Sequence, residues 1–407
     1  MKFEKILKIG AILLIGVQTV FAQNFQRELE TLWDSGFPAA RILNDTIDRG
    51  AAWVWSYALQ LKKGKTDTAV FAKLSQIEAG GPVVLSHIPR AERSLLRLGY
   101  FVKNSDAKLY RIENRNRLVP AFDLADATAN FAEASFAYDA AAGENNLYLA
   151  VQLLNIAGTA RDFSLSGENS ENYSSVETSY KEPFIFGTKG SLKLSAFFNE
   201  EDSVKQQGID LAYIQKLGWE WQYSVGGGYK NDKIFSSISL LYDNRDKVPL
   251  PFSGLSVEGI AQFSKFIALS LRGENYQPFS ENWTLLYSAQ GHGMLPSNGN
   301  YERLDLFSAG GQRDFKAMQP RSLRTRAYGL GETDFQWHGL RQSALHIFGQ
   351  LGTYRNERPF SGWGRVLAAG LGWEQGISNF SLAIYYAVQQ GMQPMDGLLN
   401  LSVKMGF

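Results

Sequence analysis

Apolar side chains alternate with small or polar ones along most of this 407-residue chain, from about residue 127 to its end. Successive side chains of a β-strand point to opposite faces, so each alternating segment predicts a strand with one apolar and one polar face. The pattern is plainest at the C-terminus, where Asn, Ser, Lys and Gly separate the apolar residues Leu399, Leu401, Val403, Met405 and Phe407. It also runs through residues 219–225, 267–272 and 380–389.

The length of the alternating region decides between two kinds of β protein. A soluble β-sandwich has the same alternation but contains about 100 residues, whereas this region spans about 280 residues. A membrane-crossing strand with its turn takes about 16 to 18 residues, which predicts about sixteen strands. Closing them into a barrel satisfies every backbone amide inside lipid. The expected fold is therefore mainly β, an antiparallel transmembrane barrel of about 16 strands behind a small N-terminal α+β region.

The first residues have the features of an export signal. Three lysines precede an apolar run over Ile9–Phe21, and small or β-branched residues at its end place cleavage after Ala22. Residues 1–22 are thus expected to be a signal peptide. The alternative, a membrane anchor helix, needs about 20 apolar residues, more than the run provides. The mature chain begins at Gln23. None of its apolar runs is long enough for a membrane-spanning helix, so a membrane location requires a barrel.

The N-terminal region before the alternating segments mixes two kinds of pattern. Apolar residues at helical spacing predict helices before Gly36 and over Pro89–Leu98, where Pro89 suits the first turn. Three apolar runs between them predict strands. These runs are Trp53–Trp55, Tyr57–Leu61 and Val70–Ile77.

Composition and motifs exclude several functions. The 41 basic and 40 acidic residues leave a net charge of +1, which gives no overall field to attract nucleic acid. There is no cysteine, so disulfide and thiolate chemistry are excluded. The four histidines lack the spacing of a zinc site, and no G-x-S-x-G motif is present. We expect no enzyme activity, no metal and no cofactor.

Several motifs resemble the BamA-like superfamily of outer-membrane insertases and translocases, which includes TamA and the two-partner secretion transporters. Arg90–Phe101 resembles the second helix and following strand of a POTRA domain, and Gly36–Ala40 resembles the same turn of a shortened one. The resemblance implies four parts. They are a signal peptide at 1–22, a truncated POTRA-like segment at 23–64, a POTRA-like domain at 65–124 and an outer-membrane barrel at 125–407.

Three further motifs of this resemblance lie in the barrel region. Asn155–Arg161 is similar to a turn between early strands of the family, and Glu182–Thr188 is similar to a strand end. Asp243-Asn244-Arg245, followed by Pro251 and Gly254, resembles a D-x-R…P-x-x-G hairpin. Together these motifs support the assignment more strongly than the POTRA-like ones.

A fourth match concerns a loop that folds into the barrel lumen in the family. Gly310–Phe315 falls at the tip of that loop, which has the sequence V-R-G-F or V-R-G-Y in the family. Asp314 stands in place of the tip glycine. Gln350 stands in place of an aspartate that pairs with the loop arginine in relatives. We expect Arg313, Asp314 and Phe315 to form a latch with Glu332 and Gln350. Gln350 cannot form the bidentate ionic pair of a carboxylate, so Glu332 is the expected counter-charge. Arg313 either only pins the loop or also gates the lumen.

The first and last strands are expected to meet in a labile seam. Phe131–Tyr138 contains Ala132, Glu133, Ala134 and Ser135, which offer less packing toward lipid than Leu399–Phe407. Phe131, Phe136, Met405 and Phe407 are the seam residues that we single out. The terminal Phe407 also resembles the signal that the barrel assembly machinery recognises.

The resemblance implies a protein of the bacterial outer membrane with its N-terminal region in the periplasm, which inserts or translocates polypeptide. Its expected partners are outer-membrane lipids, unfolded or secreted polypeptide clients and the barrel assembly machinery. A passive or substrate-selective porin is the main alternative. A structural surface barrel that binds a partner is the third.

Overall fold

The computed structural model describes residues 26–407 apart from short gaps. The gaps are residues 44–45, 63, 114, 128–129, 140–143, 232, 248–249, 297–300, 312–313, 340–342, 357–361, 378–379 and 407. The expected signal peptide therefore lies outside the described residues. The chain divides into two compact units, one formed by residues up to 64, 71–92 and 103–125, and one formed by 65–70, 93–102 and 126–407.

The first unit begins with the helix predicted before Gly36, which covers residues 26–34. Leu29 and Leu32 of this helix pack with Ala40 in a small buried cluster. A hairpin follows, formed by β1 (Arg41–Leu43) and β2 (Thr46–Asp48).

A small sheet has β7 (Arg117–Phe122) at its centre. β6 (Lys108–Arg111) pairs with it antiparallel. β3 (Val54–Trp55) and β4 (Leu59–Gln60) pair with it parallel, one after the other. The runs around residues 53–61 are thus confirmed as strands, and the sheet joins strands from both sides of residue 64, where the sequence suggested a boundary. Two short strands complete the N-terminal elements, β5 (Phe101–Lys103) and β8 (Leu124–Asp126).

The prediction of a strand over Val70–Ile77 was wrong. Thr68–Ser75 forms a helix, α2, whose first amides donate to the Asp67 carboxylate at 2.8 and 3.1 Å. Asp67 is thus an N-cap, a local signal that outweighs the β-branched Val70. The helix buries Phe71, whose ring centroid lies 6.1 Å from that of Phe122. The other predicted helix is confirmed as α3 (His87–Arg97).

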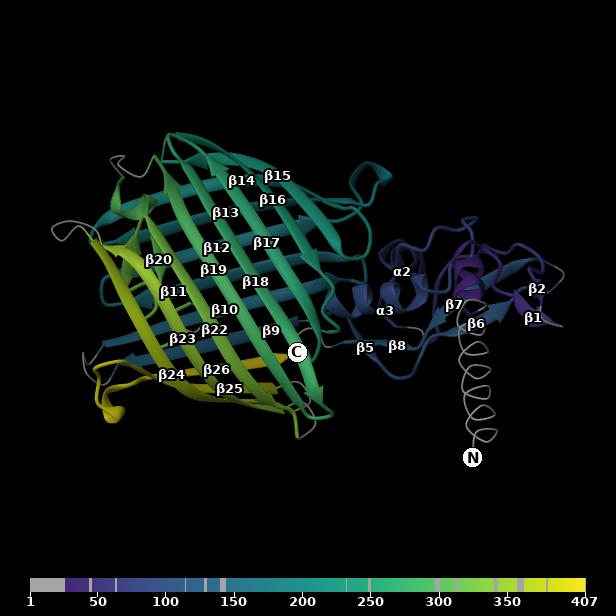
Figure 1. Cartoon of the computed structure of the whole chain (residues 1–407). Coiled ribbons are helices and arrows are strands. Elements are labelled where there is room, and N and C mark those ends of the chain that lie inside the picture. Colours follow the sequence, from purple (N-terminus) through teal and green to yellow (C-terminus); the bar gives the residue numbers. More distant parts are fainter. Residues whose placement is uncertain are drawn as a thin grey trace, which may run out of the picture. The chain divides into compact units, whose positions relative to one another are not determined.

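The second unit contains a closed antiparallel barrel of sixteen strands, as predicted (Figure 1). Neighbours in sequence pair around the barrel, and β26 returns to β9. The strands are β9 (Asn130–Asp139), β10 (Glu144–Ile156), β11 (Arg161–Ser170), β12 (Tyr173–Glu182), β13 (Gly190–Glu201), β14 (Val204–Lys216), β15 (Trp221–Lys230), β16 (Lys233–Asp243), β17 (Gly254–Phe263), β18 (Ile267–Ser280), β19 (Trp283–Leu295), β22 (Ala327–Trp337), β23 (Ser343–Asn356), β24 (Gly362–Ile377), β25 (Phe380–Gln389) and β26 (Leu398–Gly406). Short 3₁₀ turns lie at Ile185–Gly187 (η1), Arg303–Asp305 (η2) and Pro394–Asp396 (η3).

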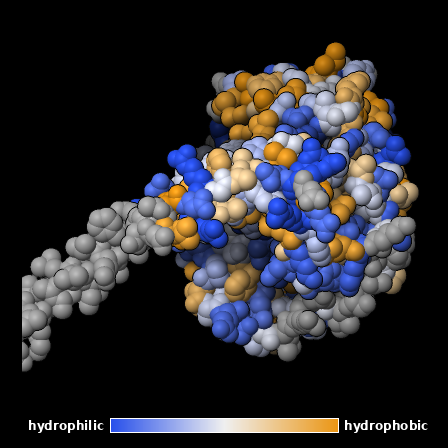
Figure 2. Space-filling model, turned by 90° about the vertical axis from the view of Figure 1, so that its right-hand side faces the viewer, coloured by the Kyte–Doolittle hydropathy of each residue, from blue (hydrophilic) through white to orange (hydrophobic). Residues whose placement is uncertain are grey.

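The barrel reverses the burial pattern of a soluble protein. In β23, Ile347 and Leu351 are 58% and 64% exposed, whereas His346 and Gln350 are 4% and 1% exposed. Apolar side chains thus point outward and polar ones inward, as expected where lipid surrounds the barrel. Hydrophobic patches lie beside hydrophilic ones on the face shown in Figure 2.

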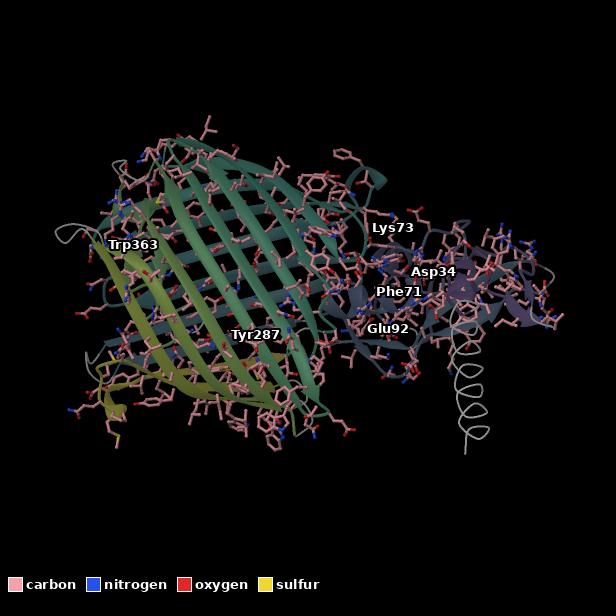
Figure 3. All side chains as sticks on the ribbon, viewed as in Figure 1. Asp34, Phe71, Lys73, Glu92, Tyr287 and Trp363 are labelled. Carbon is pink, nitrogen blue, oxygen red and sulfur yellow. The ribbon has the colours of Figure 1, made fainter. Side chains whose placement is uncertain are left out.

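Aromatic side chains form a row across neighbouring strands. Trp283 lies opposite Trp337, and Leu345 lies between Trp337 and Trp373. Figure 3 shows two further aromatic residues of the outer surface, Tyr287 and Trp363, nearer opposite ends of the barrel. Tryptophan and tyrosine are typical of membrane interfaces. Among the described residues, no helix combines the length and apolar character needed to cross a membrane.

Candidate functional site

The loop between β19 and β22 reaches into the barrel. It carries η2 and a short hairpin of β20 (Phe307–Ala309) and β21 (Leu323–Thr325). At its tip Phe315 is fully buried in a hydrophobic cluster with Phe348 and Tyr385, which belong to β23 and β25. A Cβ atom at Gly352 would lie 2.2 Å from the Phe315 ring, so glycine at this position makes room for the ring.

A polar network surrounds the same tip. The Lys316 ammonium lies 2.6 Å from Glu332 Oε1, and their side chains are only 10% and 8% exposed. Gln350 Oε1 accepts the Lys316 backbone N–H at 2.9 Å. The Gln350 amide nitrogen donates to Asp314 O at 2.8 Å and to Glu332 Oε2 at 2.6 Å. Asn400 of β26 donates to Lys316 O at 3.4 Å. We call Asp314, Phe315, Lys316, Glu332 and Gln350 the tip latch.

Gln350 does more here than replace a carboxylate. Its amide group accepts one hydrogen bond and donates two, a combination that an ionised carboxylate cannot provide because it only accepts. An aspartate at position 350 would also place a second negative charge beside Glu332. The glutamine therefore fits a latch whose cation is contributed by Lys316.

Four of the five residues predicted for the latch lie together: Asp314, Phe315, Glu332 and Gln350. The fifth, Arg313, lies outside the described residues, so its partner remains a prediction. Sequence reasoning missed Lys316, which stands next to Phe315 and pairs with the expected counter-charge Glu332. The motif indicated Arg313 as the cation. Lys316, three residues later, can also reach a carboxylate of the lumen.

The first and last strands of the barrel are paired along their whole common length. β26 and β9 are in register without a shift from Leu398 opposite Asp139 to Gly406 opposite Phe131. Ser135 and Ser402 lie opposite each other, with their Oγ atoms 2.9 Å apart. The seam, as we call this β9–β26 pairing, is therefore closed.

The two faces of the seam differ from the prediction. Asn400 contacts the loop inside the barrel, so Ser402, opposite Ser135, also faces inward, as does Glu133, which accepts a hydrogen bond from Ser402. Glu133 and Ser135 therefore do not weaken the lipid-facing side. Only the two small residues Ala132 and Ala134 do so, opposite Met405 and Val403.

The other seam residues divide between these faces. Phe136 and Met405 are exposed on the outer surface. The Phe131 ring lies under the Lys404 ammonium, 3.3 Å from the ring centroid. Phe407 lies outside the described residues.

The first barrel motif, Asn155–Arg161, binds the segment at residues 65–70. Asn155 Nδ2 donates to Thr66 Oγ1 at 2.8 Å, and Gly158 O accepts the Asp67 N–H at 3.0 Å. Gly158 has a φ of +74°, and a Cβ atom there would lie 1.9 Å from Lys65 O. The motif glycine thus permits both the left-handed turn and the close contact.

The segment at residues 93–102 is bound by other turns of the barrel. The Arg97 guanidinium donates to Trp219 O at 2.6 Å and to Arg245 O at 3.2 Å. Arg245 belongs to the D-x-R motif and is held by an ion pair of 2.9 Å with Asp243. The Tyr100 hydroxyl donates to Asp162 at 2.7 Å, and burial raises the pKa of this phenol, so it stays protonated.

We predict that Gly158→Ala destabilises the barrel unit more than Gly187→Ala. Both glycines have nearly the same φ, +74° and +71°, but nothing lies within 4 Å of a Cβ at Gly187. Both variants should lose about 1–2 kcal/mol from the left-handed backbone. Gly158→Ala should lose about 1–3 kcal/mol more from overpacking. Urea or heat unfolding in detergent measures the difference, and equal midpoints for the two variants would contradict the prediction.

The described residues of the lumen form structural latches. Among the residues that the structure describes, no group of three or more His, Cys, Asp or Glu side chains is placed to hold a metal ion. Buried polar groups of the lumen instead bind one another and the loop tip. This arrangement can hold or release a segment of the chain.

Comparisons with known proteins agree with this fold. Residues 155–237 match the model of the Omp85 superfamily domain. BamA from Haemophilus ducreyi lacking POTRA domains 1–3 is 13% identical, with a TM-score of 0.55 over 93% of this chain and 92% of that one. CdiB from Escherichia coli is 11% identical, with a TM-score of 0.63 over 92% and 82%. CdiB from Acinetobacter baumannii is 12% identical, with a TM-score of 0.60 over 93% and 80%. No curated protein matches the sequence.

The sixteen-stranded barrel and its outward apolar surface define a β-barrel protein of the bacterial outer membrane. The match of residues 155–237 to the Omp85 superfamily domain confirms the predicted resemblance. Proteins of this superfamily are non-enzymatic transporters and insertases.

Proposed function

We propose that the protein inserts polypeptide into the outer membrane or translocates it across that membrane. The observation that carries this proposal is the tip latch, which holds a folded loop in part of the lumen. A lumen that is closed by a releasable segment suits intermittent passage of a client. The likeness to BamA and CdiB supports the same class of function.

The N-terminal region is the proposed site of client capture. We assign residues 23–64 and 65–124 to POTRA-like segments that lie in the periplasm. β6 pairs with β7 on one side, and its Leu109 and Tyr110 side chains are exposed. An extended polypeptide can add to such a strand through backbone hydrogen bonds. The C-terminal Phe407 is the proposed signal for the barrel assembly machinery.

A passive porin is the second candidate, and conductance separates the two. A porin keeps its lumen open, whereas the tip latch should hold the single-channel conductance of the unmodified protein low. A steady, large conductance in planar bilayers would favour the porin. A structural surface barrel would have neither large conductance nor polypeptide clients.

Site-specific photocrosslinking in cells tests capture directly. A photoreactive amino acid at Leu109 or Tyr110 should crosslink to newly exported polypeptides. The matched control is Ile42 of the β1–β2 hairpin, which is similarly exposed. Equal yields at the three positions, or no crosslinked polypeptide at any of them, would remove capture at this strand.

A further inference from the structure

A cavity of about 270 Å³ lies at one end of the barrel. The β15–β16 and β17–β18 hairpins line it together with both ends of the β19–β22 loop and residues of β12, β13 and β14. Hairpins alternate between the two ends of an antiparallel barrel, so this end is opposite the turn at Asn155–Arg161. We call the space the rim cavity.

The charged residues of the rim cavity are mostly basic. Of the described residues that line it, five are basic and two are acidic. They are Lys230, Lys233, Lys265, Arg321 and Arg324, against Glu302 and Asp305. Arg321 and Arg324 are paired with Glu168 and Glu201. The excess of positive charge therefore comes from the three lysines, which face two carboxylates, and it favours an anionic ligand.

Three lysines share the two carboxylates. Lys233 lies 2.7 Å from Glu302, and Lys265 lies 2.8 Å from Asp305 and 3.6 Å from Glu302. Lys230 lies 3.8 Å from Asp305. The hydrogen bond from Lys233 lowers the pKa of Glu302, so this group stays ionised at neutral pH. Its side chain is 55% exposed, so the carboxylate between Lys233 and Lys265 is open to solvent.

The uncharged part of the wall suits a sugar. It offers amide and hydroxyl groups, including Asn199 and Ser308, beside the rings of Tyr173 and Phe266. Ser308 Oγ is buried and has no hydrogen-bond partner among the described residues. Buried polar groups are nearly always satisfied, so this hydroxyl needs a hydrogen-bond partner that the described residues do not supply.

We propose that the rim cavity binds a phosphorylated saccharide. The phosphate would lie between Lys233 and Lys265 in place of the Glu302 carboxylate, and the sugar would contact the polar and aromatic wall. Binding would release Glu302 and loosen the start of the loop, while the tip latch stays formed. The ligand can be the headgroup of a lipopolysaccharide or a soluble sugar phosphate, which share this chemistry. The site does not depend on polypeptide transport and would equally serve a porin.

Calorimetric titration of the folded, full-length protein tests the site. Glucose 6-phosphate is the soluble probe, and glucose is its uncharged control. Phosphatidylcholine vesicles with and without lipid A test the lipid source. Saturable binding of either phosphorylated probe supports the proposal, and the two arms identify the source. Binding of neither probe, or equal binding of glucose and glucose 6-phosphate without lipid A binding, overturns it.

Variants connect the binding to the lysines. The double variant Lys233→Gln/Lys265→Gln should bind about tenfold more weakly, as expected for the loss of charge-assisted hydrogen bonds. Lys205→Gln is the matched control, because Lys205 is an exposed lysine of the β13–β14 hairpin at the same end and does not line the cavity. A single charge reversal, Lys265→Glu, serves if the double variant does not fold. Unchanged affinity in the cavity variants, or an equal loss in Lys205→Gln, refutes the assignment.

Discussion

Replacing Glu332 by Ala should release the loop tip and raise the single-channel conductance. The substitution leaves the Lys316 ammonium and one Gln350 hydrogen bond without their acceptor in a buried site. Removing one member of a buried ion pair costs about 3–5 kcal/mol. That cost is large enough to shift a folded loop toward its released state. Protease cleavage within residues 309–321 should become faster in parallel.

A double variant controls for loss of fold. Lys316→Met/Glu332→Leu removes both charges, and replacing a buried pair by apolar residues of similar size is often neutral. It should therefore keep more of the loop protection than Glu332→Ala. The same measurements on Arg313→Ala test the predicted role of that arginine. If conductance and cleavage are unchanged in Glu332→Ala, the tip latch does not hold the loop.

Locking the seam should abolish insertion or secretion. The chain has no cysteine, so Ser135→Cys/Ser402→Cys introduces one disulfide between opposite residues of β9 and β26. The backbone groups of the seam strands can pair with a client strand instead of with each other. The net free-energy cost of this exchange is small, because no backbone group is left without a hydrogen bond in lipid. A covalent bond prevents that exchange. We expect loss of activity in a reconstituted assay and recovery on reduction.

Another serine pair provides a matched control. Ser224 and Ser239 lie opposite each other in β15 and β16, with Oγ atoms 2.7 Å apart. A disulfide there stiffens the barrel without closing the seam and should leave activity intact. Full activity of the crosslinked seam variant would show that lateral opening is not the mechanism. Equal loss in both variants would indicate general rigidity as the cause.

The barrel could be predicted from sequence because lipid imposes a simple rule on every strand. Outward residues such as Ile347 and Leu351 must be apolar, and their neighbours are free to be polar. The alternation therefore appeared in the sequence and gave the strand number. It predicted the observed bounds of β25, Phe380–Gln389, and it predicted each end of β26 to within one residue.

The site was harder to predict because it depends on contacts between distant segments. Lys316 and Glu332 meet only after the loop has folded inward, and no local pattern distinguishes Lys316 from Arg313. The faces of Glu133 and Ser135 required the register of β9 against β26. At α2 the deciding signal is local, because the Asp67 cap starts a helix within an apolar run that also suits a strand.

The amide of Gln350 has a consequence for how the loop can leave. One side chain binds the backbone of Asp314 and Lys316, on either side of Phe315, and the carboxylate of Glu332. These bonds come from one planar amide group, so we expect a rotation of that group to break them together. Because an amide does not titrate, acid does not change the charge of the Gln350 side chain. We therefore expect the loop to be released by a competing chain or ligand rather than by a change of charge at residue 350.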